Sequence, residues 1–267
     1  MKDPAVSTAD QSKSEARSSA SDAGLHVVFT DPKQLDCSYP PTDVIELWCG
    51  KLAASETNLK VFSSLLNDAE LERAARFKRN ADGEKFKIAR GTLRCILGAA
   101  LKVNPETIEF ETGKFGKPTL KDFPALHFNL SHCDRYMLIA LSSDAPVGVD
   151  VEQHNRTTNV DAIARKHFSE SENLLLQEKT GQTRLHLFFD IWTKKEAVVK
   201  SLGTGISQAL TDLPPEEQLT EQGWYVQGLD TDTLYGITDE EASASAALAI
   251  QVTGRIPSIQ TRRWDWT

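Results

Sequence analysis

Three acidic residues and one lysine have types and spacing that could hold a divalent cation beside a phosphate group. Asp150 and Glu152 alternate with valines in the segment Gly148-Val149-Asp150-Val151-Glu152, so in a strand both carboxylates point to the same face. Adjacent carboxylates repel each other unless a cation neutralises them. Their oxygens suit Mg²⁺, which also keeps waters and phosphate oxygens as ligands. By itself the pattern is also typical of an ordinary solvated strand edge.

Glu196 and Lys200 lie on a segment with helical periodicity. One stripe of the predicted helix carries apolar side chains and one acid: Leu185, Phe189, Trp192, Glu196 and Val199. An acid on an apolar face is costly to bury unless it is paired or bound to a metal. A Glu–Lys pair four residues apart on a surface helix would contribute only about 0.2–0.5 kcal/mol. The position of Glu196 beside Trp192 therefore favours a site over a surface pair.

Basic residues in the first half of the chain suggest a place for an anion. They are Arg73, Arg76, Lys85 and Arg90, on or between predicted helices. The segment Gly113-Lys114-Phe115-Gly116-Lys117-Pro118 predicts a turn in which glycines expose backbone N–H groups and lysines add movable charges. Asn129-Leu130-Ser131-His132 ends a predicted strand with polar side chains suited to phosphate oxygens.

Composition limits the class of protein. The chain has 267 residues, 40% of them hydrophobic, and its 30 basic and 38 acidic side chains give a net charge of −8. These values exclude collagen-like, coiled-coil and wholly disordered chains. No apolar run is long enough to predict a membrane span. The acidic balance argues against nucleic acid as a partner, so an anionic ligand requires a local basic cluster.

The cysteines and the N-terminal segment indicate a cytoplasmic protein. The four cysteines are scattered without a Cys-x-x-Cys pair, as in proteins of reducing compartments, and we expect no zinc site. Residues 1–24 are rich in serine and alanine and lack the apolar core of a signal peptide. We expect them to form a disordered arm.

The order of predicted elements repeats along the chain. The first half reads as a strand at 45–48, a helical region at 65–77, a long helix at 83–101, and strands at 108–111, 126–130 and 136–141. The second half reads as a strand at 147–151, helices at 160–168, 170–178 and 184–202, and strands at 224–227, 233–237 and 246–252. We predict an α+β fold, a pseudo-twofold duplication of two similar lobes (25–145 and 146–254) with a ligand cleft at their interface, followed by a tail at 255–267.

Four ordered motifs together resemble the 4′-phosphopantetheinyl transferases, in particular the long, two-lobed, surfactin-synthetase-activating type. They are Phe115–Pro118, Phe128–His132, Gly148–Glu152 and Trp192–Lys200. The resemblance implies transfer of phosphopantetheine from coenzyme A (CoA) to a serine of an apo acyl or peptidyl carrier protein, with release of 3′,5′-ADP. It also implies Mg²⁺ as cofactor. Because one chain contains both halves of the cleft, we expect a monomer.

The resemblance also implies roles for individual residues. Asp150, Glu152 and Glu196 match metal ligands, and Glu196 and Lys200 match catalytic positions. The residues that match CoA contacts are Arg73, Lys85, Lys117, Pro118, Ser131, His132, Asp150, Lys195 and Lys200, with Arg90 as a weaker match. Either Glu196 or a water could take the serine proton, and Lys200 could offset charge on the leaving group.

Two other functions remain compatible with the sequence. A Mg²⁺-dependent phosphohydrolase of CoA or nucleotides would use the same carboxylates with water as nucleophile, whereas a non-catalytic CoA-binding module would not need Glu196 on an apolar stripe. For the transferase, an acidic carrier protein would need a local basic or apolar docking surface, since the net charge is −8. We place that surface in residues 157–179, which follow the acidic strand.

Overall fold

The computed structural model describes residues 28–155, 157–204, 210, 213–236 and 243–267, so the predicted arm at 1–24 lies outside the described residues. The first part of the chain forms β1 (Val28–Phe29), η1 (Pro32–Gln34), β2 (Val44–Lys51), α1 (Glu56–Leu65), α2 (Asp68–Ala75), α3 (Asn80–Leu101), η2 (Pro105–Thr107), β3 (Phe110–Thr112), β4 (Pro118–Leu120), β5 (His127–His132) and β6 (Tyr136–Ser142). The second part forms β7 (Val147–Gln153), α4 (Val160–His167), α5 (Glu170–Gln177), α6 (Gly181–Leu202), α8 (Glu216–Glu221), β8 (Trp224–Leu229), α9 (Thr231–Tyr235), β9 (Ala244–Gln251) and β10 (Ser258–Trp264).

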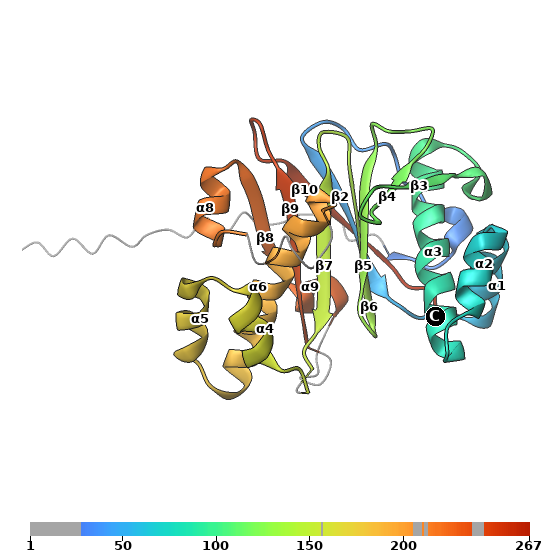
Figure 1. Ribbon diagram of the computed structural model, residues 1–267. Coiled ribbons are helices and arrows are strands. Elements are labelled where there is room, and N and C mark those ends of the chain that lie inside the picture. Colours follow the sequence, from blue (N-terminus) through green and yellow to red (C-terminus); the bar gives the residue numbers. More distant parts are fainter. Residues whose placement is uncertain (1–27, 156, 205–209, 211–212, 237–242) are drawn as a thin grey trace, which may run out of the picture.

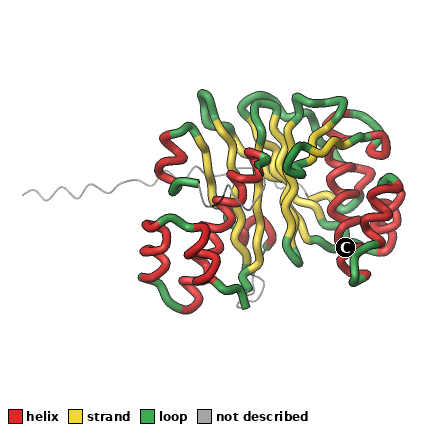
Figure 2. The backbone as a smooth tube through the Cα atoms, in the orientation of Figure 1, coloured by secondary structure: helices red, strands yellow, loops and turns green. Residues whose placement is uncertain are grey.

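Two sheets occupy the centre of the molecule, and helices cover their outer sides (Figures 1 and 2). The larger sheet has the order β1-β10-β2-β6-β5 and forms the first lobe with α1–α3. The other has the order β7-β9-β8 and forms the second lobe with α4, α5, α6 and α8, while β3 and β4 pair in a separate two-stranded sheet. The inner faces share one apolar core, in which Leu47 and Leu138 of the first lobe meet Val149 and Leu248 of the second. The predicted α+β, two-lobed fold is confirmed.

Strand β6 shows why both faces of the larger sheet are apolar. All seven of its residues are buried. Leu138 and Ala140 face the second lobe, while Met137, Ile139 and Leu141 face the core under α1 and α3. A strand covered on both sides reads as a continuous apolar run instead of an alternating one. The core between the lobes is therefore apolar, like the core within the first lobe.

The last thirteen residues do not form the predicted tail. Ser258–Trp264 is strand β10, which pairs in parallel with β2 from Ser258↔Val44 to Trp264↔Gly50. Trp264 and Trp266 are each 1% exposed in the core of the first lobe. A Cβ at Gly50 would lie 2.4 Å from the Trp264 ring, so glycine makes room for the indole. The chain thus returns to its first lobe after completing the second.

The predicted strand at 233–237 is also wrong over its described residues, because Thr231–Tyr235 is the short helix α9. Asp230 caps this helix by accepting from the backbone N–H groups of Asp232 and Thr233, and Gly236 follows with φ 64°. The β-branched and aromatic residues suggested a strand. An aspartate at the N-cap and a glycine after the last turn are the stronger signals, and they indicate a helix.

The two long predicted helices are confirmed as α3 and α6, each 22 residues long. Helix α6 ends at Gly203 with φ 67°, as the sequence predicts. The helical region predicted at 65–77 begins earlier and consists of two helices, α1 and α2, separated by the capping box of Asn67 and Glu70. No helix in the described part of the chain is both long and apolar enough to cross a membrane.

Candidate active site

The functional residues of the two lobes meet where β5 of the first lobe lies beside β7 of the second, with α6 packed on β7. Gly148 permits this packing, because a Cβ at that position would lie 1.9 Å from the Ala197 carbonyl oxygen and 2.5 Å from the Ser201 nitrogen. A larger residue would push α6 away from β7. Since α6 carries Glu196 and Lys200, glycine here sets how close these side chains come to Asp150.

Asp150 is the most enclosed of the three acids, with 1% of its surface exposed. Its Oδ1 atom accepts a hydrogen bond from the Ser131 hydroxyl at 2.8 Å and one from the Lys200 ammonium at 2.5 Å. Its Oδ2 atom is buried and has no hydrogen-bond partner among the described residues. A buried carboxylate oxygen without a donor is costly, so Oδ2 is open to a cation or to a donor from a substrate.

Glu152 and Glu196 share this environment with Asp150. Burial, together with the negative charge of Asp150, raises the pKa of Glu152 to about 7. Glu196 is only 4% exposed, and burial followed by the charges of Asp150 and Glu152 raises its pKa to about 7 as well, with Lys200 opposing the rise. The three carboxylates therefore lie close enough to repel one another. All three belong to the second lobe, in which β7 carries Asp150 and Glu152 and α6 carries Glu196. We call Asp150, Glu152, Glu196 and Lys200 the seam cluster.

The two lysines predicted to contact CoA from α6 lie in different places. Lys200 contacts Asp150 and also donates to the Ser131 hydroxyl at 2.9 Å. Lys195 is 3% exposed, forms an ion pair with Glu172 of α5 at 3.1 Å and donates to the Leu213 carbonyl. The structure therefore gives Lys195 partners away from the seam cluster, where it ties α6 to α5.

Lys117 lies at the same junction but is engaged by backbone groups. Its ammonium donates to the carbonyl oxygens of Val147 and Ser201 at 3.2 and 2.9 Å, and desolvation by burial lowers its pKa to about 8. Lys117 and Pro118, with residues of β5 and the end of α6, line a pocket of about 180 Å³. The lysine thus joins the first-lobe turn to the carboxyl end of α6.

The basic residues of the first lobe divide into exposed and buried groups. His132 ends β5 and is exposed. Lys85 of α3 forms an ion pair with Asp134 in the turn after β5, and Arg73 stacks over the Phe86 ring at 5.1 Å. Arg76 pairs with Glu72 at the surface. All four side chains lie on the first lobe. Desolvation, followed by the positive charges of Lys200 and Lys85, lowers the pKa of His132, so this residue lies near Lys200 of the seam cluster.

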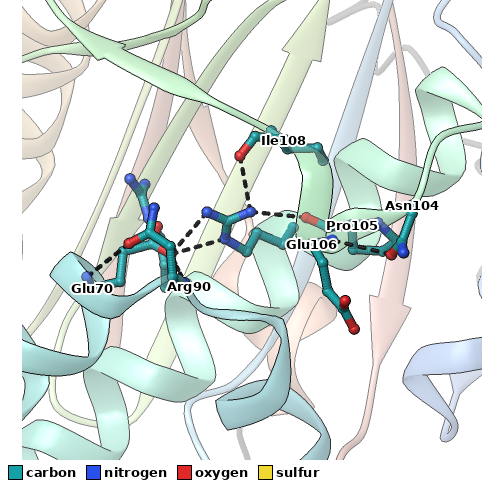
Figure 3. A network of polar contacts seen from close by, with 8 residues as sticks. Glu70, Arg90, Asn104, Pro105, Glu106 and Ile108 are labelled. Atoms are coloured by element: carbon teal, nitrogen blue, oxygen red, sulfur yellow. Dashed lines mark hydrogen bonds and ion pairs between the residues drawn. The ribbon is translucent and has the colours of Figure 1, made fainter.

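Arg90 belongs to a network of polar contacts around Glu70 (Figure 3). It donates to Glu70 at 2.5 Å and lies 4.0 Å from the centre of the Phe110 ring. Arg94, only 1% exposed, donates to Glu70 and to the carbonyl oxygens of Pro105 and Ile108. Glu70 therefore engages the Nε atom of Arg90, and the predicted contact of Arg90 with CoA stays a prediction.

Comparison with known proteins identifies the family of the chain. A model of the 4′-phosphopantetheinyl transferase superfamily matches residues 146–249, and a model of the N-terminal part of 4′-phosphopantetheinyl transferases matches residues 51–144. The 4′-phosphopantetheinyl transferase HetI of Nostoc sp. is 32% identical over 217 residues, which are 78% of this chain and 89% of HetI. The chain belongs to this superfamily.

Two further 4′-phosphopantetheinyl transferases are similar over somewhat more than half of the chain. Sfp of Bacillus subtilis is 30% identical over 151 residues, or 56% of this chain and 65% of Sfp. Gsp of Aneurinibacillus migulanus is 33% identical over 156 residues, or 57% of this chain and 63% of Gsp. The chain is a 4′-phosphopantetheinyl transferase of the Sfp type.

The seam cluster of the transferase fits a hard divalent cation by the type of its donors. Three carboxylates face one lysine, and Asp150 Oδ2 is a buried oxygen without a partner. Oxygen donors of this kind suit Mg²⁺. As the side chains stand, no group of three or more His, Cys, Asp and Glu side chains among the described residues is arranged to hold a metal ion.

Sequence reasoning missed two features beside the seam cluster. A pocket of about 520 Å³ opens beside Glu152 and is lined on its other sides by Cys133, Asp134, His154 and Phe189, among others. Asp134 contacts Lys85 at one edge of this pocket. The residues come from β7, α6 and the turn after β5, so no local pattern in the sequence could have grouped them.

Proposed function

We propose that this transferase moves the 4′-phosphopantetheine group from CoA to a serine hydroxyl of an apo acyl or peptidyl carrier protein, releases 3′,5′-ADP and requires Mg²⁺. The observation that carries the proposal is the seam cluster. Lys200 contacts the buried Asp150, and Glu152 and Glu196 lie near this pair. Burial, followed by the charge of Asp150, raises the pKa of each glutamate to about 7. Such a cluster calls for an additional cation and for an anionic ligand beyond it.

Asp150, Glu152 and Glu196 are the residues that would hold Mg²⁺. When bound, the ion would neutralise the pyrophosphate of CoA and so favour attack on its β-phosphate. Asp150 would offer its Oδ2 atom, because Lys200 and Ser131 already occupy Oδ1. Lys200 would then face the charge that develops on the leaving 3′,5′-ADP.

Glu196 would accept the proton of the attacking serine. It is nearly buried on the face of α6 that packs toward β7, and its neighbours raise its pKa to about 7, near the operating value that suits a general base. His132 and Lys85 of the first lobe, together with Arg73, would hold the phosphates of CoA. Lys117 and Pro118 line the pocket of about 180 Å³ that we assign to the adenine side.

The carrier protein would dock on the surface formed by α4 and α5. The last turn of α4 is basic, with Arg165, Lys166 and His167, and α5 exposes Leu174 and Leu175 by 55% and 49%. A basic turn beside exposed leucines suits an acidic partner with an apolar helix. The protein would act as a monomer, since both lobes come from one chain. Its free cysteines, three of them buried, suit the reducing cytoplasm.

The test is to incubate the protein with CoA, Mg²⁺ and an apo carrier protein and to weigh the carrier by mass spectrometry. We expect a gain of one phosphopantetheine group, lost when EDTA is added and restored by excess Mg²⁺. A parallel reaction without carrier distinguishes transfer from hydrolysis. Cleavage of CoA at the same rate in that reaction would support a phosphohydrolase, and binding of CoA without either reaction would support a binding module.

A further inference from the structure

Two side chains of β5 dock the first lobe onto β7 of the second. Asn129 and Ser131 alternate along β5, and each accepts a hydrogen bond from an alternate backbone N–H of β7. The Val149 N–H donates to Asn129 Oδ1 at 2.8 Å, and the Val151 N–H donates to Ser131 Oγ at 3.4 Å. β5 and β7 are edge strands of different sheets. Side chains therefore replace the backbone ladder that would otherwise join these two strands.

Ser131 also connects this docking contact to the seam cluster. Its hydroxyl donates to Asp150 Oδ1 at 2.8 Å and accepts from Lys200 Nζ at 2.9 Å. A serine hydroxyl has one donor and two acceptor positions. The donor goes to Asp150, and the acceptors go to Lys200 and Val151. Since Ser131 is only 5% exposed and its hydrogen-bonding capacity is filled, its side chain has nothing left to offer a phosphate of CoA.

We infer that Ser131 is a positioning residue that fixes Asp150 and Lys200 relative to each other, instead of the CoA contact that its motif predicts. Asn129 sets the register of β5 on β7, which places Ser131 for this role. The inference rests on the proposed function, because it assigns Asp150 and Lys200 their roles in transfer. His132, the next residue along β5, is exposed and can face the phosphate.

The Ser131 hydroxyl limits the movement of the two charged side chains that it contacts, Asp150 and Lys200. Without the Ser131 hydroxyl, Asp150 Oδ1 keeps Lys200 as its donor but loses the fixed group that sets the plane of the carboxylate. Lys200 loses one of its two anchors. Displacement of reacting groups by about 1 Å can reduce a rate by roughly 10²-fold. The loss should therefore appear in the chemical step and leave the affinity for CoA largely intact.

The experiment compares Ser131→Ala with His132→Ala in the full chain, using steady-state transfer to an apo carrier and direct titration of CoA. For Ser131→Ala we expect kcat to fall roughly 10–100-fold, a higher Mg²⁺ concentration for half-maximal activity, and a KM for CoA and a CoA affinity within about twofold of the unchanged protein. For His132→Ala we expect the opposite split, with a raised KM for CoA and nearly unchanged kcat.

Each other result for Ser131→Ala contradicts the inference. A weaker CoA affinity with kcat unchanged would make Ser131 a CoA contact, and unchanged kcat and KM would give it no role. If Ser131→Ala fails to unfold cooperatively, Ser131→Cys keeps the size of the side chain with a weaker donor and undergoes the same comparison. Absence of transfer by the unchanged protein would refute the proposed function itself, so the two failures are distinguishable.

Discussion

Glu70 in the first lobe and Asp150 at the junction of the lobes are both carboxylates almost hidden from solvent, but their partners differ in number. Glu70 accepts from the guanidinium groups of Arg90 and Arg94 and from the backbone N–H of Asn67. Asp150 has one cation, Lys200, and two further acids nearby. The first site has an excess of positive charge and donors, whereas the second has an excess of negative charge.

The difference separates a structural site from a functional one. In the Glu70 network, Arg94 continues to the carbonyl oxygens of Pro105 and Ile108, so that one carboxylate ties α2 to α3 and to the segment after it (Figure 3). Both of its oxygens are satisfied. In the seam cluster an oxygen of Asp150 is left without a donor. A protein tolerates such a cost where a ligand completes the site.

The same chemical change in the two sites should have opposite consequences, and the largest effect is expected for Glu196→Gln. We expect the rate of transfer to fall about 10³-fold, because the amide cannot accept the serine proton. The free energy of unfolding should stay equal or rise, because one of three mutually repelling carboxylates is removed. Transfer assays and urea denaturation measure the two quantities.

A matched control for Glu196→Gln is Glu106→Gln, an exposed glutamate of the first lobe. We expect it to change neither the rate nor the stability. Transfer by Glu196→Gln at more than a tenth of the normal rate would exclude Glu196 as the base.

Glu70→Gln should chiefly affect stability. It leaves the guanidinium of Arg94, which is 1% exposed, without its counter-charge, and breaking a buried ion pair costs roughly 3–5 kcal/mol. We expect urea denaturation to show a loss of this size, while kcat per folded molecule stays within about twofold of normal. A large fall in kcat without loss of stability would mean that the Glu70 network is part of the active site.

Added Mg²⁺ should sharpen the comparison further, because only one of the two sites gains from a cation. At a Mg²⁺ concentration of about 100 Kd, binding should stabilise the unchanged protein by roughly 2.7 kcal/mol. Thermal unfolding with and without Mg²⁺ measures this as a rise in Tm. We expect the rise to persist in Glu70→Gln and to disappear in Glu196→Gln. A full rise in Glu196→Gln would place the cation elsewhere.

The smallest effect is expected for a pair at the surface. Arg76 and Glu72 form an ion pair at 3.1 Å with side chains that are 77% and 68% exposed. Exposed pairs contribute little because water and salt screen them. Arg76→Ala should change the free energy of unfolding by less than about 0.5 kcal/mol. A loss of unfolding free energy as large as that expected for Glu70→Gln would show that charge pairing, and not burial, decides how much these ion pairs contribute to stability.

Local patterns predicted most of the fold and the acidic part of the site. The alternation around Asp150, the helical stripe that contains Glu196, and Gly203 after the last turn of α6 all have the predicted structural consequences. One error, the strand predicted at 233–237, overlooked the local cap signals of α9. The other concerns a contact between distant residues. Strand β10 pairs with residues more than two hundred positions earlier, and the sequence around 258–264 gives no sign of its partner.

By itself the sequence determined which residue types are available and in which elements they lie, because helix and strand periodicities are local properties of the chain. Only the tertiary structure decided what each side chain faces. Lys195 and Lys200 lie on the same helix, yet the first pairs with Glu172 and the second reaches Ser131 and Asp150, which are 69 and 50 positions away. The energy of a buried charge depends on all the elements packed around it, and that surrounding is fixed only when the two lobes close on each other.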